Sequence, residues 1–379
     1  MSSSKRKHKG MALVLPAFIL AVGGLLFVEE AFSASTLQSL IEGARAEGQL
    51  DLMITSTQGE KGGRELTDAF NKRFGLNIKT NADLSGLEDQ KITQAVAETK
   101  GGIAPTFDLM QAQALHVYRL LSSGGAERIE NWDMLLKEIV TEAYKVKDIA
   151  SPGVLGGYGF QWGNRVLALL YNPKLISKAD LPRTWKEKAD PKYAGAYSAP
   201  PWIGTILSGI IKYDRDEWLQ IMKGVGQNKR QVLTFAAAVQ RLLLGELKFV
   251  EANTETYFLE KARDPSAPLE LTYYEEFTPV DQVVYVVRKG ARHPNAAKLF
   301  ALWVSGAESS GIFEKYSFVS KLYLDTPITQ KIKAILAERK VKPVSWFDSQ
   351  QTVEKMRWLE TEEGVKYSAA ISKAQREGM

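Results

Sequence analysis

Short polar stretches stand at five points where an apolar run gives way to a helical pattern. Hydroxyl and amide side chains, with the free N–H groups of helix starts, can hold an anion or a polar solute. Ser, Thr and Asn also serve as ordinary helix caps, so one such stretch alone predicts little. Five that converge on one cleft favour binding. The candidate ligand-binding residues are Ser56, Thr57, Gln58, Ser85, Gln111, Trp202, Gly204, Thr205, Asn253, Glu255 and Tyr257.

Aromatic residues offer two further kinds of site. Trp202 would either stack on a planar or cationic ligand or belong to the core, and the sequence leaves both open. Tyr273 and Tyr274, followed by Glu275 and Glu276, carry oxygen ligands of the kind that suits ferric ion. We expect these two tyrosines instead to be strand residues that face opposite ways.

Catalytic patterns have little support in this sequence. It contains three histidines and no cysteine, and no HExxH, GxSxG, P-loop or GxGxxG pattern. We therefore predict that the protein is not an enzyme and that it has no cofactor and no catalytic or metal-site residues. A secreted hydrolase that uses paired carboxylates stays an alternative, because such pairing is spatial and not sequential.

The elements that must position these residues alternate between strand and helix. Apolar runs at 50–55, 76–80 and 107–110 predict strands, each followed by a helical pattern, which indicates a parallel α/β sheet. A second α/β unit lies between two bare apolar runs at 166–171 and 283–288. Two lobes joined at mid-chain predict a ligand cleft between them.

Six short motifs stand in order along the chain. They read LIEGARAEG at 40–48, LYNPKLI at 170–176, DLPRTW at 180–185, DPKYAG at 190–195, GEL at 245–247 and GARHPNAAKLF at 290–300. Together they resemble the periplasmic solute-binding proteins of ABC transporters, in the group that binds ferric ion or small organic solutes. The resemblance covers essentially the whole chain after the N-terminal segment.

The resemblance implies an α/β fold of two lobes with two crossings between them. Lobe one would comprise 36–164 and 283–340, and lobe two 165–282 and 341–379. It implies a protein that captures a small polar or anionic solute and delivers it to the membrane permease of an ABC importer. Ferric ion is the alternative ligand, but the position of the adjacent tyrosines in the ferric-binding relatives reads TETYF here, at 254–258, so at most one tyrosine remains.

The N-terminal sequence and the net charge limit where the protein can work and which partners it can have. A basic cluster at 5–9, an apolar run at 11–28 and small residues at 31–35 predict a signal peptide, 1–33, and a periplasmic or extracellular protein. An uncleaved segment would instead tether the protein to the membrane. The net charge of +5 includes no basic stripe, so we expect no nucleic-acid partner. We expect a monomer.

Overall fold

The computed structural model describes residues 36–202, 204 and 206–378. The predicted signal peptide, 1–33, and Thr205 lie outside the described residues. In the first half of the chain, β1 (Gln49–Met53) pairs in parallel with β2 (Lys79–Asp83) on one side and with β3 (Leu109–Ala112) on the other. The alternation of strand and helix expected from the sequence is therefore present.

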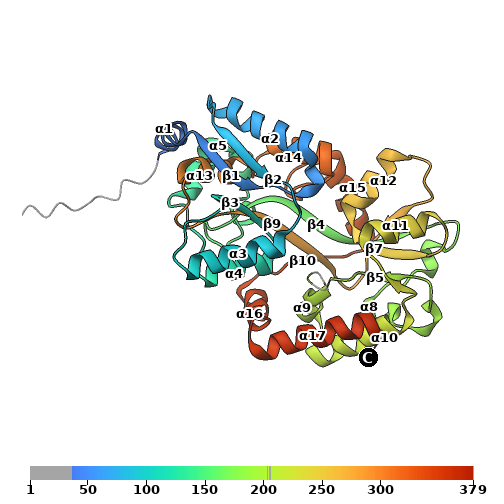
Figure 1. The fold of residues 1–379 in the computed structure, drawn as a ribbon. Helices are drawn as coiled ribbons and strands as arrows, with labels where there is room; N and C mark the ends of the chain where they lie inside the picture. The colour runs from blue at the N-terminus through green and yellow to red at the C-terminus, as the bar shows by residue number, and fades with distance from the viewer. Residues whose placement is uncertain (1–35, 203, 205, 379) are drawn as a thin grey trace, which may run out of the picture. The chain divides into compact units, whose positions relative to one another are not determined.

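Helices cover the strands of this half, which we call lobe one (Figure 1). Most of their apolar faces share one core, in which Leu40, Leu52, Phe70, Phe300 and Trp303 are buried. Ile92 and Val117 belong to a different core. Gly75, at the C-terminal end of α2, adopts φ +59°, a left-handed conformation that favours glycine and ends the helix. The helices are α1 (Leu37–Glu47), α2 (Gly59–Phe74), α3 (Glu88–Lys100), α4 (Ala114–Ser122), α5 (Trp132–Ile139), α6 (Thr141–Tyr144), α7 (Lys147–Ala150), α13 (Pro294–Trp303) and α14 (Ala307–Ser317).

Two long antiparallel strands, β4 (Phe160–Tyr171) and β9 (Thr278–Val287), join the halves. The last residues of β9 pair with β3 of lobe one, whereas the last residues of β4 pair with β7 of the other half. Hydrogen bonding therefore continues from one half to the other through these two strands (Figure 1). Both are longer than the predicted runs at 166–171 and 283–288.

In the second half, which we call lobe two, helices pack on the strands that continue the sheet beyond β4. Val166, Leu170, Val250 and Ala252 lie in one core with Tyr257 of α12. The elements are α8 (Trp185–Lys188), β5 (Ser198–Ala199), α9 (Gly209–Lys212), α10 (Arg215–Asn228), β6 (Gln231–Val232), α11 (Phe235–Leu243), β7 (Phe249–Asn253), α12 (Thr254–Arg263) and β8 (Glu270–Thr272).

The C-terminal elements pack mainly on lobe two. They are α15 (Pro327–Glu338), β10 (Pro343–Val344), α16 (Gln350–Trp358) and α17 (Glu362–Glu377). Ile371 and Ala374 of α17 share a core with Trp218 of α10. Ile332 and Leu336 of α15 also join the lobe-two core, although we assigned 283–340 to lobe one. The boundary near residue 340 stays a prediction.

Candidate functional site

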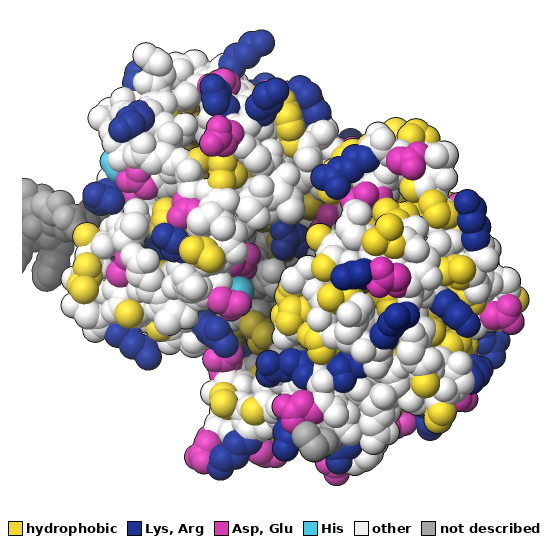
Figure 2. All heavy atoms as spheres, turned by 45° about the vertical axis from the view of Figure 1, so that its right-hand side comes forward, with side chains coloured by type: hydrophobic (Ala, Val, Ile, Leu, Met, Phe, Trp, Pro, Cys, Tyr) yellow, Lys and Arg dark blue, Asp and Glu magenta, His cyan; other side chains and the backbone are white. Residues whose placement is uncertain are grey.

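A cavity of about 660 Å³ lies where the two lobes and the C-terminal helices meet. Figure 2 shows a hollow between two masses of side chains, with acidic and basic groups along its edge. Strand ends and helix starts line it, as expected for an open α/β sheet. Ser56 follows β1, Gln111 and Gln113 lead from β3 into α4, and Asn253 leads from β7 into α12.

Arg165 of β4 brings a guanidinium group to the cavity wall. Its Nη2 donates to Thr55 Oγ1 at 3.0 Å, and its Nε lies 3.6 Å from Glu255 Oε1. Asp281 of β9 is the residue opposite Arg165 in the ladder and also lines the cavity. A side chain held by a strand and a hydroxyl group in this way is set in place before a ligand arrives, which favours affinity.

Glu255 lies behind Arg165 and not on the cavity wall. It sits in the first turn of α12 with 13% of its side chain exposed. Burial raises the pKa of this carboxyl group to about 7, although the nearby Arg165 acts in the opposite direction. A carboxyl group with a raised pKa offsets the charge of Arg165 less than an ordinary carboxylate would.

His116 of α4 lies between two carboxylates at the start of α3. Its Nδ1 lies 2.5 Å from Glu88 Oε1, and its Nε2 lies 2.6 Å from Asp89 Oδ1. Burial lowers the pKa of the imidazole, but the bonds to Asp89 and Glu88 outweigh it and raise the pKa to about 9. The backbone N–H of Gln113 also donates to Glu88. The charged groups of His116, Glu88 and Asp89 satisfy one another, so they hold this side of the cavity wall in a fixed position.

The opposite side of the cavity is apolar. Trp202 is 40% exposed and meets the ring of Phe235 edge to face, with the centroids 4.9 Å apart. The C-terminal helices add further apolar groups. The apolar lining residues of this side are Pro201, Trp202, Leu207, Phe235, Trp346, Leu359 and Val365.

The structure brings together only some of the residues that the sequence singled out. Thr57 and Ser85 are exposed outside the lining. Gln58 is buried and donates to the carbonyl oxygen of Ile312, and Tyr257 is buried and accepts from Lys331. These positions follow from helix packing, which turns Gln58 and Tyr257 inward. The predicted residues that line the cavity are Ser56, Gln111, Trp202, Gly204 and Asn253.

Several cavity residues escaped the sequence reasoning. Arg165 precedes the apolar run at 166–171, and a lone charge in a buried strand was a signal that could have found it. Arg119 donates from Nε to Glu360 Oε1 at 3.2 Å, joining α4 to the turn before α17. Glu360, Trp346 and Val365 carried no sequence signal, because their place depends on how the C-terminal helices pack.

The tyrosines considered for ferric ion are engaged elsewhere. Tyr273 and Tyr274 follow β8, so our expectation of strand residues was wrong, but the two buried side chains do face different cores, as we expected. Tyr274 donates to Glu251, and the Tyr273 hydroxyl group lies 3.2 Å from Thr254 Oγ1. Burial raises the pKa of both phenols, which disfavours the phenolate form. Among the described residues, no tyrosine lines the cavity.

A second group with metal-ligand character lies elsewhere in lobe one. Asp51, Asp108 and His293 bring their ligand atoms within 4.8 Å of one another. The oxygens already accept hydrogen bonds: Asp108 Oδ1 from the backbone of Arg292 and His293, and Asp51 from Asn81. These bonds tie β1 to the start of α13, so the group has a structural role.

Comparison with known families decides the broader identity. Residues 65–313 match the family described as bacterial extracellular solute-binding protein. The chain belongs to this family. Its members are the capture components of ABC importers, and they work outside the cytoplasm. A sequence comparison with curated proteins found no match. No helix in the described part of the chain combines the length and the hydropathy of a membrane span.

Solved structures show the same two-lobed fold, which confirms the predicted architecture. Iron-bound HitA from Pseudomonas aeruginosa is 19% identical, with a TM-score of 0.59 over 83% of this chain and 99% of its own. Trichodesmium IdiA (FutA) with iron and citrate is 16% identical, with a TM-score of 0.63 over 86% and 99%. AfuA from Actinobacillus pleuropneumoniae with fructose-6-phosphate is 18% identical, with a TM-score of 0.61 over 83% and 98%.

Proposed function

We propose that this solute-binding protein captures a small organic solute that carries an anionic group, and that Arg165 is the anchor for that group. The observation that carries the proposal is the guanidinium group at the cavity wall, hydrogen-bonded to Thr55 and 3.6 Å from a half-neutralised Glu255. The starts of α4 and α12 also line the cavity, and neither helix has a side-chain cap at its N-terminus. Hydroxyl or amino groups of the same solute would meet Gln111 and Asp281.

Ferric ion fits these residues less well. A hard, highly charged ion needs several anionic oxygens close together. Such ions occur in the HitA and IdiA structures, whereas AfuA holds a sugar phosphate. Here Tyr257, Tyr273 and Tyr274 are buried outside the cavity lining. The volume of about 660 Å³ lies within the range of sites for organic molecules.

The remaining parts of the proposal concern the working state of the protein. Among the described residues, the cavity lining offers groups that bind and no nucleophile paired with a base, and we propose a transport receptor without catalysis. We expect it to act as a monomer, to hand its solute to the permease of an ABC importer, and to be released by cleavage after residue 33. N-terminal sequencing of exported protein would test the last point.

Replacement of Arg165 tests the anchor. We expect native mass spectrometry of freshly purified protein to show a bound organic anion, and Arg165→Gln to weaken its binding at least about 100-fold, or about 2.7 kcal/mol. Arg241→Gln, a surface change outside the cavity lining, is the matched control. Equal retention of the solute by both variants would contradict the anchor. Tight binding of ferric citrate that Tyr257→Phe or Tyr273→Phe abolishes would establish the ferric alternative.

A further inference from the structure

The C-terminal segment, residues 345–378, reaches the cavity although the family match ends at residue 313. Figure 1 shows α16 below α4, and α17 lying along α10. The segment contributes a substantial share of the lining at one end of the cavity. Its lining residues are Trp346, Leu359, Glu360, Val365 and Ser368.

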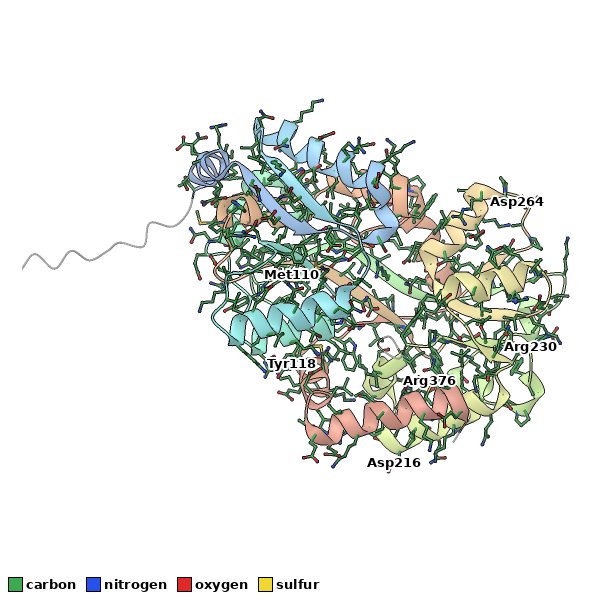
Figure 3. All side chains as sticks on the ribbon, in the orientation of Figure 1. Met110, Tyr118, Asp216, Arg230, Asp264 and Arg376 are labelled. Carbon is green, nitrogen blue, oxygen red and sulfur yellow. The ribbon has the colours of Figure 1, made fainter. Side chains whose placement is uncertain are left out.

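This segment is fixed firmly to lobe two. The backbone of α10 approaches α17 so closely that a Cβ on Gly226 would lie 1.8 Å from the carbonyl oxygen of Ala374. Gln375 donates from Nε2 to the carbonyl oxygen of Pro200 at 2.7 Å, and Lys355 donates to that of Ile210 at 2.8 Å. Figure 3 shows this packing, with Arg376 and Asp216 marking the two helices. The segment therefore acts as part of the lobe-two wall.

The same segment faces α4 of lobe one. Glu360 accepts from Arg119, and Arg357 lies over the ring of Tyr118 at 5.9 Å. Behind these contacts, Val117 of α4 and Met356 of α16 line a smaller cavity of about 300 Å³. Residues 345–378 thus close one end of the main cavity between the two lobes.

The exposed apolar group that the segment presents at the cavity is Val365, which lies beside the polar Glu360 and Ser368 in the lining. Trp346 and Leu359 are 2% and 4% exposed, so their positions are set by the core, whereas Val365 is 57% exposed. A small inorganic anion at Arg165 would be too small to use this surface as well. A solute with an apolar body would remove it from water, and differences of one methylene change discrimination by about tenfold or more.

We propose that residues 345–378 form a specificity-determining wall, which selects organic anions that carry an aromatic or branched apolar body over small inorganic anions. The proposal rests on Arg165 as the anchor of the anionic group. Trp346, Leu359 and Val365 supply the selection, and Glu360 with Arg119 holds the wall against lobe one. A wall outside the family-matched region lets the ligand differ between relatives while the fold stays the same.

Matched pairs of anions test the proposal on the full chain by titration calorimetry. The pairs are inorganic phosphate with phenyl phosphate, and acetate with phenylacetate. We expect the aryl member of the pair that binds to bind at least about tenfold more tightly. Val365→Asn and Leu359→Ala should reduce this preference to less than about threefold and leave the affinity for the small anion unchanged.

The controls separate the two proposals. Met134→Asn alters a residue that is 63% exposed on α5, outside the lining, and should leave every affinity unchanged. Because Val365 is exposed, its replacement tests the wall even where Leu359→Ala fails to fold. If both members of a pair bind with equal affinity, or if the Val365 variant loses affinity equally for both, the specificity wall is wrong. The Arg165 anchor would not be affected by either result. Binding of no member of either pair would overturn the anion-anchored function and the wall with it.

Discussion

The charge group on the cavity wall of lobe one differs in exposure from the ion pair in the core of lobe two. Lobe one places an ionised group at the cavity surface, where His116 lies between Glu88 and Asp89. Lobe two presents Trp202 and Phe235 to the cavity and keeps an ion pair deep in its interior. One wall can therefore hydrogen-bond a solute while the other excludes water from its apolar part.

The buried pair of lobe two joins Lys188 to Glu251. Each side chain is 1% exposed, and Glu251 also accepts from Tyr274. The ammonium group lies 4.5 Å from the ring centroid of Tyr197 and 5.3 Å from that of Trp185. Burial lowers the pKa of Lys188, which Glu251 opposes. The difference between these two groups is thus one of position: a charge group on a cavity wall costs little desolvation, and one in a core costs much, as it also does for Arg288 and Glu98 of lobe one.

Removing one partner of the buried pair should have the largest effect. We expect Lys188→Met to lower the free energy of unfolding by about 3–5 kcal/mol, because Glu251 is left buried without its cation. Urea unfolding would measure this change. Lys186→Met is the control, since Lys186 is 75% exposed and lies 3.9 Å from Glu217, and its cost should stay below about 0.5 kcal/mol.

The double variant Lys188→Met/Glu251→Gln sharpens the result. Without the orphaned carboxylate, much of the lost stability should return. If Lys188→Met lowers the free energy of unfolding no more than Lys186→Met does, the buried pair does not differ from exposed charges in the way that we infer.

Truncation of the lobe-two aromatic wall should have an intermediate effect. We expect Trp202→Ala to weaken the binding of phenyl phosphate about tenfold, or about 1.4 kcal/mol, and that of inorganic phosphate less than twofold. Titration calorimetry would measure both affinities. Leu244→Ala, at an exposed residue outside the lining, should change neither. Equal losses for both anions would show that Trp202 supports the fold and does not select the solute.

The polar wall was more predictable than the apolar wall. Ser56, Gln111 and Asn253 follow strands, and strand ends of an α/β sheet converge wherever the helices pack. Trp346 and Val365 reach the cavity only because α17 packs tightly on α10, and no local pattern records that contact. The sequence therefore identified strand ends that line the cavity and missed the wall that long-range packing builds.

The two strands that cross between the lobes, β4 and β9, show the same limit of sequence-based prediction. Apolar runs predicted strands at 166–171 and 283–288, whereas β4 and β9 begin at Phe160 and Thr278. The added residues include Gln161, Asn164 and Gln282, which interrupt the hydropathy but still pair between the strands. Ladder hydrogen bonds extend a strand past its apolar part once a partner lies beside it, and that partner comes from about 120 residues away in sequence.

The charge group of lobe one should give the smallest effect and a pH dependence. The pKa of folded His116 is about 9, above the ordinary value of 6.5, because Asp89 and Glu88 outweigh burial. A group with a raised folded pKa stabilises the protein fully below about pH 6.5, and this contribution is lost as the pH rises through about 9. Asp89 is 85% exposed, so solvent screens part of the interaction.

We expect the stability difference between the wild type and His116→Gln to shrink by about 1 kcal/mol between pH 6 and pH 9.5. Urea unfolding at both values measures it, and Glu88→Gln, which removes one of the two carboxylates, should weaken the same pH dependence. A difference that is constant with pH would show that the pKa of His116 is the same in the folded and unfolded states, and the contrast with the buried pair of lobe two would then fail.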